Sequence, residues 1–425
     1  MAETTKAGKI VEMAARDSYG RLLAYLVART GDVDAAEDAL AEAFLKALES
    51  WPKMGVPDRP AAWLLTTARR RHIDQYRHNQ SVGRLVDTLI ADAERDAFAP
   101  EKEFSLETHF PDERLKLLFL CTHPTIEAGV RTPLMLQTVL GIDAATIANA
   151  FLTSPSTMGQ RLSRAKMKIR DAGIRLEAPP ELELAPRIDS VLDAIYAAYG
   201  LGWDRAVVDG ADRRWRGLSD ESIWLARLTI SLLPNDPEAM GLLALMLYCE
   251  ARTAGRRGPD GEYVPLSDQD ASRWSTSMIE EAEALLSTAA TARRIGRYQL
   301  EAAIQSAHSR RAYGEEVDWM AVAGLYAGLV IVDPTIGARV GQAAAVAKAA
   351  SASEGLRFLE SIDVDAVAAY QPYWALKAHL LQEVGDVDGA RGAYQRAIGL
   401  SEDPAVQAFL RRRMDPEDAA VDRPT

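Results

Sequence analysis

Cysteine is scarce in this chain of 425 residues, with only Cys121 and Cys249, far apart in the sequence. Such a pair does not indicate the disulfide framework of a small secreted protein. No run of about 18 apolar residues is present, and the richest stretch, EAMGLLALMLYCEA at 238–251, has the length of a buried helix. The N-terminal stretch also lacks the apolar core and cleavage site of a signal peptide. We therefore expect a cytoplasmic protein with no membrane partner.

Motifs of catalysis and metal binding are missing as well. The sequence has no glycine-rich phosphate loop, no His-Glu-x-x-His helix, no Cys-x-x-Cys pair and no Gly-x-Ser-x-Gly elbow. Cys121 and His123 lie close together, but two ligands do not make a zinc site, and we interpret them as the cap of a core helix. The stretch DGEYVPLSDQD at 260–270 lacks the carboxylate spacing of a calcium loop. We expect no enzymatic activity, no cofactor and no bound metal.

Charge is unevenly distributed along the chain, whose formal net charge is −12. Residues 1–80 have a net charge of +1, residues 81–110 of −4, residues 111–180 of +3 and residues 181–425 of −12. A nucleic-acid partner responds to the local field rather than to the total. The acidity belongs to the C-terminal half, and the N-terminal part contains basic islands.

Helical spacing of apolar residues runs through nearly the whole sequence, and no alternating β-branched run predicts a strand. We predict an all-α protein of several domains. These are a helical bundle at 10–80, an acidic linker at 81–110, a small helical domain at 111–176 and a long helical extension at 180–425. The proline-rich stretch EAPPELELAP at 177–186 marks the last boundary. Residues 374–404 form a predicted helix pair that looks like a tetratricopeptide repeat.

A basic helix is predicted at residues 154–170. Ser154 is a good N-cap, and Pro155 suits the first helical position. Just upstream, GIDAATIANAF at 141–151 predicts a short helix with Asp143 as its N-cap, and a Leu-Thr-Ser turn joins the two. Two short helices joined by a tight turn, the second one basic, fit a DNA-binding helix-turn-helix. The alternative is an amphipathic helix whose cations are only solvated.

The faces of this basic helix follow from about 100° of rotation per residue. Met158, Leu162, Ala165 and Ile169 share a narrow arc, which we predict to be buried. A neighbouring polar arc would meet base edges in the major groove, and cations on its flanks would meet phosphates. The candidate DNA-binding residues are Thr157, Gln160, Arg161, Arg164, Lys166 and Lys168.

A second basic helix is predicted at 58–78, with Pro60 at its start. Asp74 is spaced to pair with Arg70 and Arg77 on one face, which also holds Trp63. An exposed aromatic ring beside oriented guanidinium groups suits an unstacked base of single-stranded DNA. A structural salt-bridge network with Trp63 in the core explains the pattern equally well. The candidate residues are Trp63, Arg69, Arg70, Arg71, Asp74 and Arg77.

The helix predicted at 31–51 is acidic in its first half and has an apolar stripe beside the acidic residues. Acidic residues suit the N-terminus of any helix, and an acidic rim around an apolar stripe also suits docking to a basic protein surface. The sequence does not rank these two explanations. The candidate docking residues are Asp34, Glu37, Asp38, Leu40, Phe44 and Leu45.

The order of these parts resembles the extracytoplasmic-function (ECF) sigma factors, which consist of sigma-2 and sigma-4 domains. The resemblance rests on DAAEDALAEAFLKALESW, then PAAWLLTTARRRHIDQYR, then DAATIANAFLTSPSTMGQRLSRAKMKIR. It implies core RNA polymerase and promoter DNA as partners, with contacts to the β′ clamp helices and the β subunit. Residues 31–51 would bind the clamp helices, residues 58–80 would melt and read the −10 element, and residues 154–170 would read the −35 element.

The rest of the chain is similar to the ECF subgroup with a long tetratricopeptide-like C-terminal extension. The segments LCTHP, GLLALMLYCEAR, DGEYVPLSDQDASRW, YQLEAAIQSAHS and ARGAYQRAIGL carry this likeness. The chain departs from that subgroup at YAAYGLGW (196–203) and RVGQAAAV (339–346), both in the extension. The resemblance implies a regulatory role for the extension, which would act in cis on the sigma domains.

Three hypotheses follow. The first is an alternative sigma factor, in which the acidic linker mimics nucleic acid inside polymerase and the extension either inhibits or assists the sigma domains, including by intramolecular contact. The second is a polymerase-independent helix-turn-helix regulator with a helical-repeat interaction domain, which would bind duplex DNA tightly by itself. The third is a helical scaffold with incidental basic helices, which would show no salt-dependent affinity for DNA.

Overall fold

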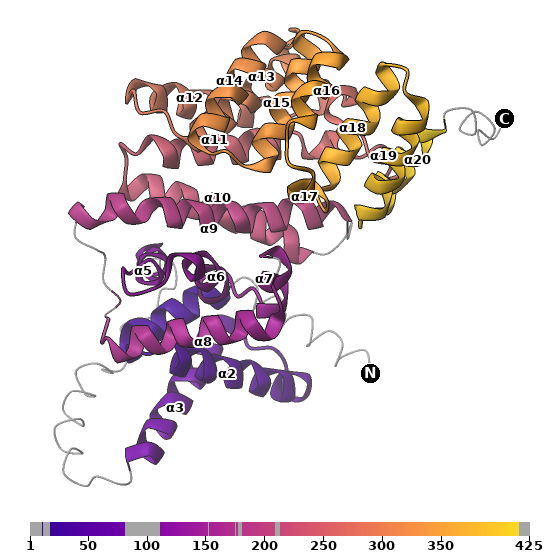
Figure 1. The fold of residues 1–425 in the computed structure, drawn as a ribbon. Helices are drawn as coiled ribbons and strands as arrows, with labels where there is room; N and C mark the ends of the chain where they lie inside the picture. Colours follow the sequence, from indigo (N-terminus) through magenta and orange to yellow (C-terminus); the bar gives the residue numbers. More distant parts are fainter. Residues whose placement is uncertain are drawn as a thin grey trace. The chain divides into compact units, whose positions relative to one another are not determined.

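The computed structural model describes residues 11, 18–80, 111–151, 153–174, 176, 181–208 and 213–415. In these ranges the ordered elements are helices, and no strand occurs among them apart from an isolated bridge between Arg257 and Tyr263 (Figure 1). The predicted all-α class is confirmed. The predicted acidic linker at 81–110 lies outside the described residues.

The chain divides into two compact units. The first comprises Met1–Ala206 and Ala211–Leu228, and the second comprises Val207–Gly210 and Thr229–Thr425. The first unit therefore continues beyond the proline-rich stretch at which the sequence predicts a boundary. It contains a helix at residues 18–30, followed by α2 (Val33–Met54), α3 (Pro60–Gln80), α5 (Pro111–Cys121), α6 (Ala128–Thr138), α7 (Ala144–Ala150), α8 (Pro155–Asp171) and most of α9 (Glu181–Val208) and α10 (Arg213–Leu232).

The helices α2 and α3 pack against each other through small, aliphatic and aromatic residues. Asp32 caps α2, because its carboxylate accepts a hydrogen bond from Ala35 N at 3.1 Å. Gly55 ends the helix with a φ of 86°, a conformation that glycine adopts without strain. The interior of this part of the unit is apolar and includes Leu40, Ala43, Ala47, Trp51, Leu64, Leu65 and Ala68.

A buried arginine joins α5 to α10. Arg114 forms an ion pair with Glu221, and its guanidinium carbon lies 3.8 Å from the centre of the Trp224 ring. Burial, together with nearby Arg21, lowers the pKa of Arg114. This contact explains physically why the start of the C-terminal half packs with the N-terminal helices.

The second unit is a series of helices in which α11 is buried on nearly all sides. Glu238 on α11 accepts hydrogen bonds from Tyr298 N at 2.9 Å and Gln299 N at 3.2 Å, and so caps the start of α13. After α11 (Pro237–Ala251) follow η1 (Thr253–Gly255), η2 (Leu266–Asp268), η3 (Ala271–Arg273), α12 (Thr276–Thr291), α13 (Arg297–Ser309), η4 (Arg310–Tyr313), α14 (Trp319–Val332), α15 (Ile336–Ala349), α16 (Ala352–Glu360), α17 (Val364–Val367), α18 (Gln371–Glu383), α19 (Val387–Leu400) and α20 (Pro404–Met414). The helix pair predicted at 374–404 is confirmed, since α18 and α19 occupy that range.

Candidate nucleic-acid interface

The predicted pair of short helices is present as α7 and α8. Asp143 caps α7 by accepting hydrogen bonds from Ala145 N at 3.1 Å and Thr146 N at 2.9 Å. Ser154 caps α8, because its hydroxyl accepts a hydrogen bond from Thr157 N at 3.2 Å, and Pro155 takes the first helical position. Both predicted caps are therefore confirmed. Few residues separate the helices, and α7 packs directly on α8.

The predicted inner face of α8 is confirmed, since Met158, Leu162, Ala165 and Ile169 are all buried. On the outer face Gln160, Arg161, Arg164 and Lys168 are exposed, and Thr157 is half-buried. Within the described part of the chain, Arg161, Arg164 and Lys168 take part in no ion pair. One helix thus presents three uncompensated cations and two neutral hydrogen-bonding groups on a single open face, which is the chemistry that a DNA groove requires.

Lys166 departs from the helical pattern. That pattern places it on an exposed flank, whereas its side chain is only 8% exposed. Its ammonium Nζ lies 2.5 Å from Glu37 Oε2 and 3.5 Å from Asp34 Oδ1, both on α2. In this structure Lys166 is thus occupied by two carboxylates, and phosphate contact by Lys166 remains a prediction for another conformation.

Burial dominates the electrostatics of Glu37. It raises the pKa of the Glu37 carboxyl, while Lys166 acts in the opposite direction and lowers it. The second carboxylate oxygen, Oε1, is buried and has no hydrogen-bond partner in the structure. A buried carboxylate that is only partly satisfied stabilises its surroundings less than a fully paired one would.

The candidate docking face on α2 is divided between surface and core. Asp38 is exposed, Phe44 is half-buried and Leu45 is 60% exposed. Leu40, in contrast, is fully buried, because it points into the α2–α3 interior, so the predicted direct contact of Leu40 with polymerase is not available in this structure. An open apolar patch beside carboxylates remains on α2.

On α3 the predicted base platform is partly packed. Trp63 is half-buried, and its ring lies 5.5 Å from that of Trp51 at an angle of 67°, so it contributes to the core as well as to the surface. Arg71 pairs with Glu42 of α2, with Nη2 and Oε1 3.0 Å apart, whereas Arg70 is exposed and Arg69 half-buried. The side chains of the other two candidate residues, Asp74 and Arg77, lie outside the described residues.

The described residues offer little for metal or thiol chemistry. No group of three or more His, Cys, Asp or Glu in that part of the chain is placed to hold a metal ion. Cys121 is fully buried, and burial raises the pKa of its thiol to about 12, which keeps it protonated and unreactive. Its Sγ lies 3.4 Å from Thr138 Oγ1. None of the described helices is long and apolar enough to cross a membrane.

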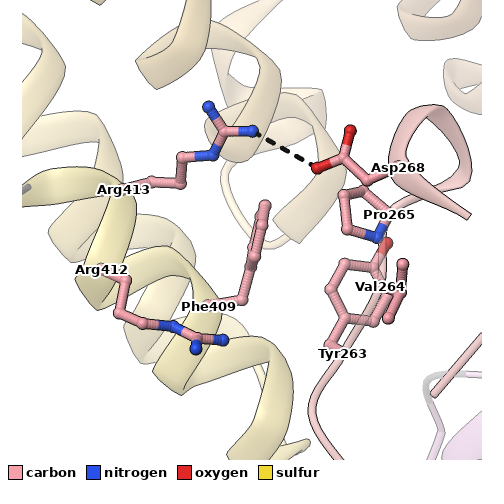
Figure 2. A pocket seen from close by; sticks show the side chains of 7 residues that line it. All are labelled: Tyr263, Val264, Pro265, Asp268, Phe409, Arg412 and Arg413. Carbon is pink, nitrogen blue, oxygen red and sulfur yellow. Dashed lines mark ion pairs between the residues drawn. The ribbon is translucent and has the colours of Figure 1, made fainter. Parts of the chain in front are cut away.

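The second unit contains a pocket of about 320 Å³ between the segment before η2 and helix α20 (Figure 2). The rings of Tyr263 and Phe409 meet edge to face in its wall, 5.3 Å apart. Arg413 faces Asp268 at 3.8 Å, and Arg412 has no ion pair among the described residues. Val264 and Pro265 complete the lining.

Comparisons with known proteins match two separate ranges of the chain and one relative over nearly its whole length. Residues 15–82 match the model of sigma-70 region 2, and residues 187–290 match a family of unknown function, DUF6596. Over 403 residues the chain is 34% identical to "Uncharacterized protein R00370" of Rhizobium meliloti (strain 1021), with 94% of this chain and 92% of that protein covered. No solved structure matches the chain. The region 2 match contains α2 and α3, whereas α5–α8 lie between the two matched ranges.

Sequence reasoning did not find the contacts that join distant segments. Lys166 and Glu37 are 129 residues apart, and no helical spacing relates them. Arg114 likewise meets residues of α10 that carry no local signal of that pairing. The helical pattern places Lys166 on an exposed flank of α8, so the sequence carries no local signal of this contact.

Proposed function

The chain belongs to the protein family that includes R00370 and contains a sigma-70 region 2, and from this premise we propose that it is an alternative sigma factor of the ECF type. It directs core RNA polymerase to specific promoters and starts transcription there. The observation that carries the proposal is the presence of a capped helix-turn-helix, with uncompensated cations on α8, in the same chain as region 2.

In this proposal α8 reads the −35 element as duplex DNA. Arg161 and Arg164 are exposed one turn apart and pair with no acidic residue in the described part of the chain, so both guanidinium groups are available to bind base edges bidentately. Thr157 and Gln160 offer neutral hydrogen bonds near the start of the helix, and Lys168 is placed for the phosphate backbone.

The −10 element is assigned to α3 as a single strand. Arg70 is the strongest candidate, because it is exposed and its loss removes no packing. Trp63 retains enough exposed surface to stack on a base, although its contact with Trp51 means that a substitution also weakens the core. Arg69, Arg71, Asp74 and Arg77 complete the proposed set.

Polymerase docking is assigned to α2. The half-buried ring of Phe44 and the exposed side chain of Leu45 lie beside Asp38 and form a patch that suits the β′ clamp helices. Asp34 and Glu37 lie on the same helix. Apolar residues surrounded by charge of one sign are typical of a docking site for a surface of the opposite sign. We assign the β subunit to the sigma-4 part, residues 111–176.

The C-terminal extension is proposed to regulate these parts in cis as a tetratricopeptide-like domain. Two facts support a connection: Arg114 binds α10, and the matched DUF6596 range begins within α9. A chain that ends after Leu228 keeps these contacts and removes the helices that follow. Higher transcription from the shortened chain would indicate inhibition by the extension, and lost transcription would indicate that the extension assists.

A binding measurement separates this function from the polymerase-independent alternative. Labelled promoter duplex is titrated with the full-length protein, with and without core polymerase, at several salt concentrations. A sigma factor binds its duplex tightly only when core polymerase is present. Equally tight, sequence-specific binding without polymerase would support the helix-turn-helix regulator instead, and the absence of salt-dependent binding in both arms would support a scaffold.

A further inference from the structure

Two helices with different proposed partners are joined by a buried ion cluster. Lys166 of α8 contacts Glu37 at 2.5 Å and Asp34 at 3.5 Å, both on the polymerase-docking helix α2. The Glu37 side chain is 17% exposed and that of Lys166 is 8% exposed. The Glu37 carboxylate and the Lys166 ammonium are therefore paired inside the unit, whereas the Asp34 side chain stays 34% exposed.

A second contact lies between the same two parts of the chain. A Cβ atom on Gly20, in the helix at residues 18–30, would lie 1.9 Å from the carbonyl oxygen of Val139, directly after α6. A Cβ on Gly141 would lie 2.9 Å from Tyr19 Cδ1. The backbone of the region 2 part thus touches the backbone that leads into the helix-turn-helix, which only glycine permits at position 20.

The two parts cannot stay in this contact while each reads its proposed promoter element. Elements centred at −10 and −35 are about 25 base pairs apart, which is about 85 Å of duplex at 3.4 Å per base pair. In the structure α8 touches α2, which packs against α3. The 30 residues at 81–110 can reach about 100 Å when fully extended, so the chain length allows the separation.

We propose that the Lys166–Glu37–Asp34 cluster, together with the Gly20–Val139 contact, is a lock that holds the protein in a closed form and that core polymerase opens by binding α2. In the closed form Lys166 of α8 balances one of the two negative charges of Asp34 and Glu37 and holds Glu37 inside the unit. When polymerase takes these carboxylates, α8 is released to the upstream promoter element. This inference rests on the proposed function and adds its regulation.

The Lys166–Glu37–Asp34 cluster is held together by only part of the hydrogen bonds that its buried carboxylate could make, so a competing partner can displace it. Glu37 Oε1 is buried and has no hydrogen-bond partner among the residues that the structure describes, so the cluster leaves part of the desolvation of that carboxylate uncompensated. The raised pKa of Glu37 reflects the same cost, since burial outweighs the attraction of Lys166. A basic surface on polymerase that pairs both oxygens would therefore compete effectively with one lysine.

The test measures the affinity of full-length variants for core polymerase in the absence of DNA. Lys166→Met removes the ion cluster, and Gly20→Ala separates the backbones without changing any residue of the proposed interfaces. Both variants are expected to bind core polymerase with an affinity at least about fivefold higher than that of the unmodified protein. The reason is that the contact between α8 and α2 no longer competes with polymerase for α2. The matched controls are Arg412→Met and Gly129→Ala. Arg412 is an exposed cation with no ion pair among the described residues, and a Cβ on Gly129 would meet nothing within 4 Å. If neither variant binds more tightly while the unmodified protein binds, the lock is refuted.

A lysine-labelling experiment on the unmodified protein guards against variants that fail to fold. Lys166 should be protected from an amine-reactive reagent in the free protein, and its labelling rate should rise about fivefold or more when core polymerase is added. Equal protection of Lys166 with and without bound polymerase would overturn the proposal. If the protein does not bind core polymerase at all, the proposed function fails. The contact itself is then still tested, because Gly20→Ala should increase Lys166 labelling in the free protein.

Discussion

Substitution of Arg161 or Arg164 by alanine tests the DNA-reading face of α8 without disturbing the fold. Both side chains are exposed and form no ion pair with any residue that the structure describes, so we expect each substitution to change the free energy of unfolding by no more than about 0.5 kcal/mol. A bidentate contact between an arginine and a base is worth about 1–3 kcal/mol of discrimination. The affinity of the polymerase complex for its preferred duplex should therefore fall about 5- to 150-fold for each variant. The loss should be smaller on a duplex that is altered at the contacted position.

Lys168→Ala provides the contrast, because a phosphate contact carries no sequence information. Its affinity should fall by a similar factor on all duplexes, and the slope of log affinity against log salt should decrease by about 0.9. Fluorescence anisotropy with core polymerase, at a series of salt concentrations, measures both effects, and Arg412→Ala in the second unit is the control. Unchanged affinity and unchanged preference in both arginine variants would refute the assignment of this face to DNA.

Three further predictions concern stability. Leu162→Ala, at a fully buried position of α8, should lower the free energy of unfolding of the first unit by about 2–5 kcal/mol in a urea titration, and a loss below about 1 kcal/mol would contradict the packing. Glu238→Gln weakens the cap of α13 and should lower the free energy of unfolding by about 1–2 kcal/mol. Glu280→Gln, on the exposed face of α12, is the control and should leave the free energy of unfolding almost unchanged. Equal effects of the two substitutions would refute the cap. Burial and two nearby arginines lower the pKa of His308 from 6.5 to about 4, so the unfolded chain binds a proton in that window that the folded chain does not. Stability should thus fall by about 3 kcal/mol more between pH 6.5 and pH 4 in the unmodified protein than in His308→Gln. An identical pH dependence of the two proteins would contradict this.

The helix-turn-helix was accessible from sequence because its signals are local. An N-cap acts on the next three residues and a helical arc repeats every three or four, so Ser154 and the buried face of α8 followed from short-range rules. The same locality explains why the class of the fold and the starts of α3, α7 and α8 were predictable.

The contacts of Lys166 and Trp63 were not accessible in this way. A helical wheel separates apolar from polar faces, but it does not show that a second helix covers part of the polar face. Lys166 is buried by α2, which precedes it by more than one hundred residues, and Trp63 meets Trp51 across a turn. Which residues of the candidate site are free thus depends on tertiary packing, which places Leu40 inside and leaves Leu45 outside.

The central claim is that this chain gives core RNA polymerase a promoter preference. Transcription in vitro on a promoter library, with start sites mapped by sequencing, tests it directly. We expect transcripts from a small set of templates that share upstream elements near −35 and −10. Addition of Arg161→Ala protein should weaken the preference at the upstream element. A transcript pattern identical to that of core polymerase alone would contradict the account.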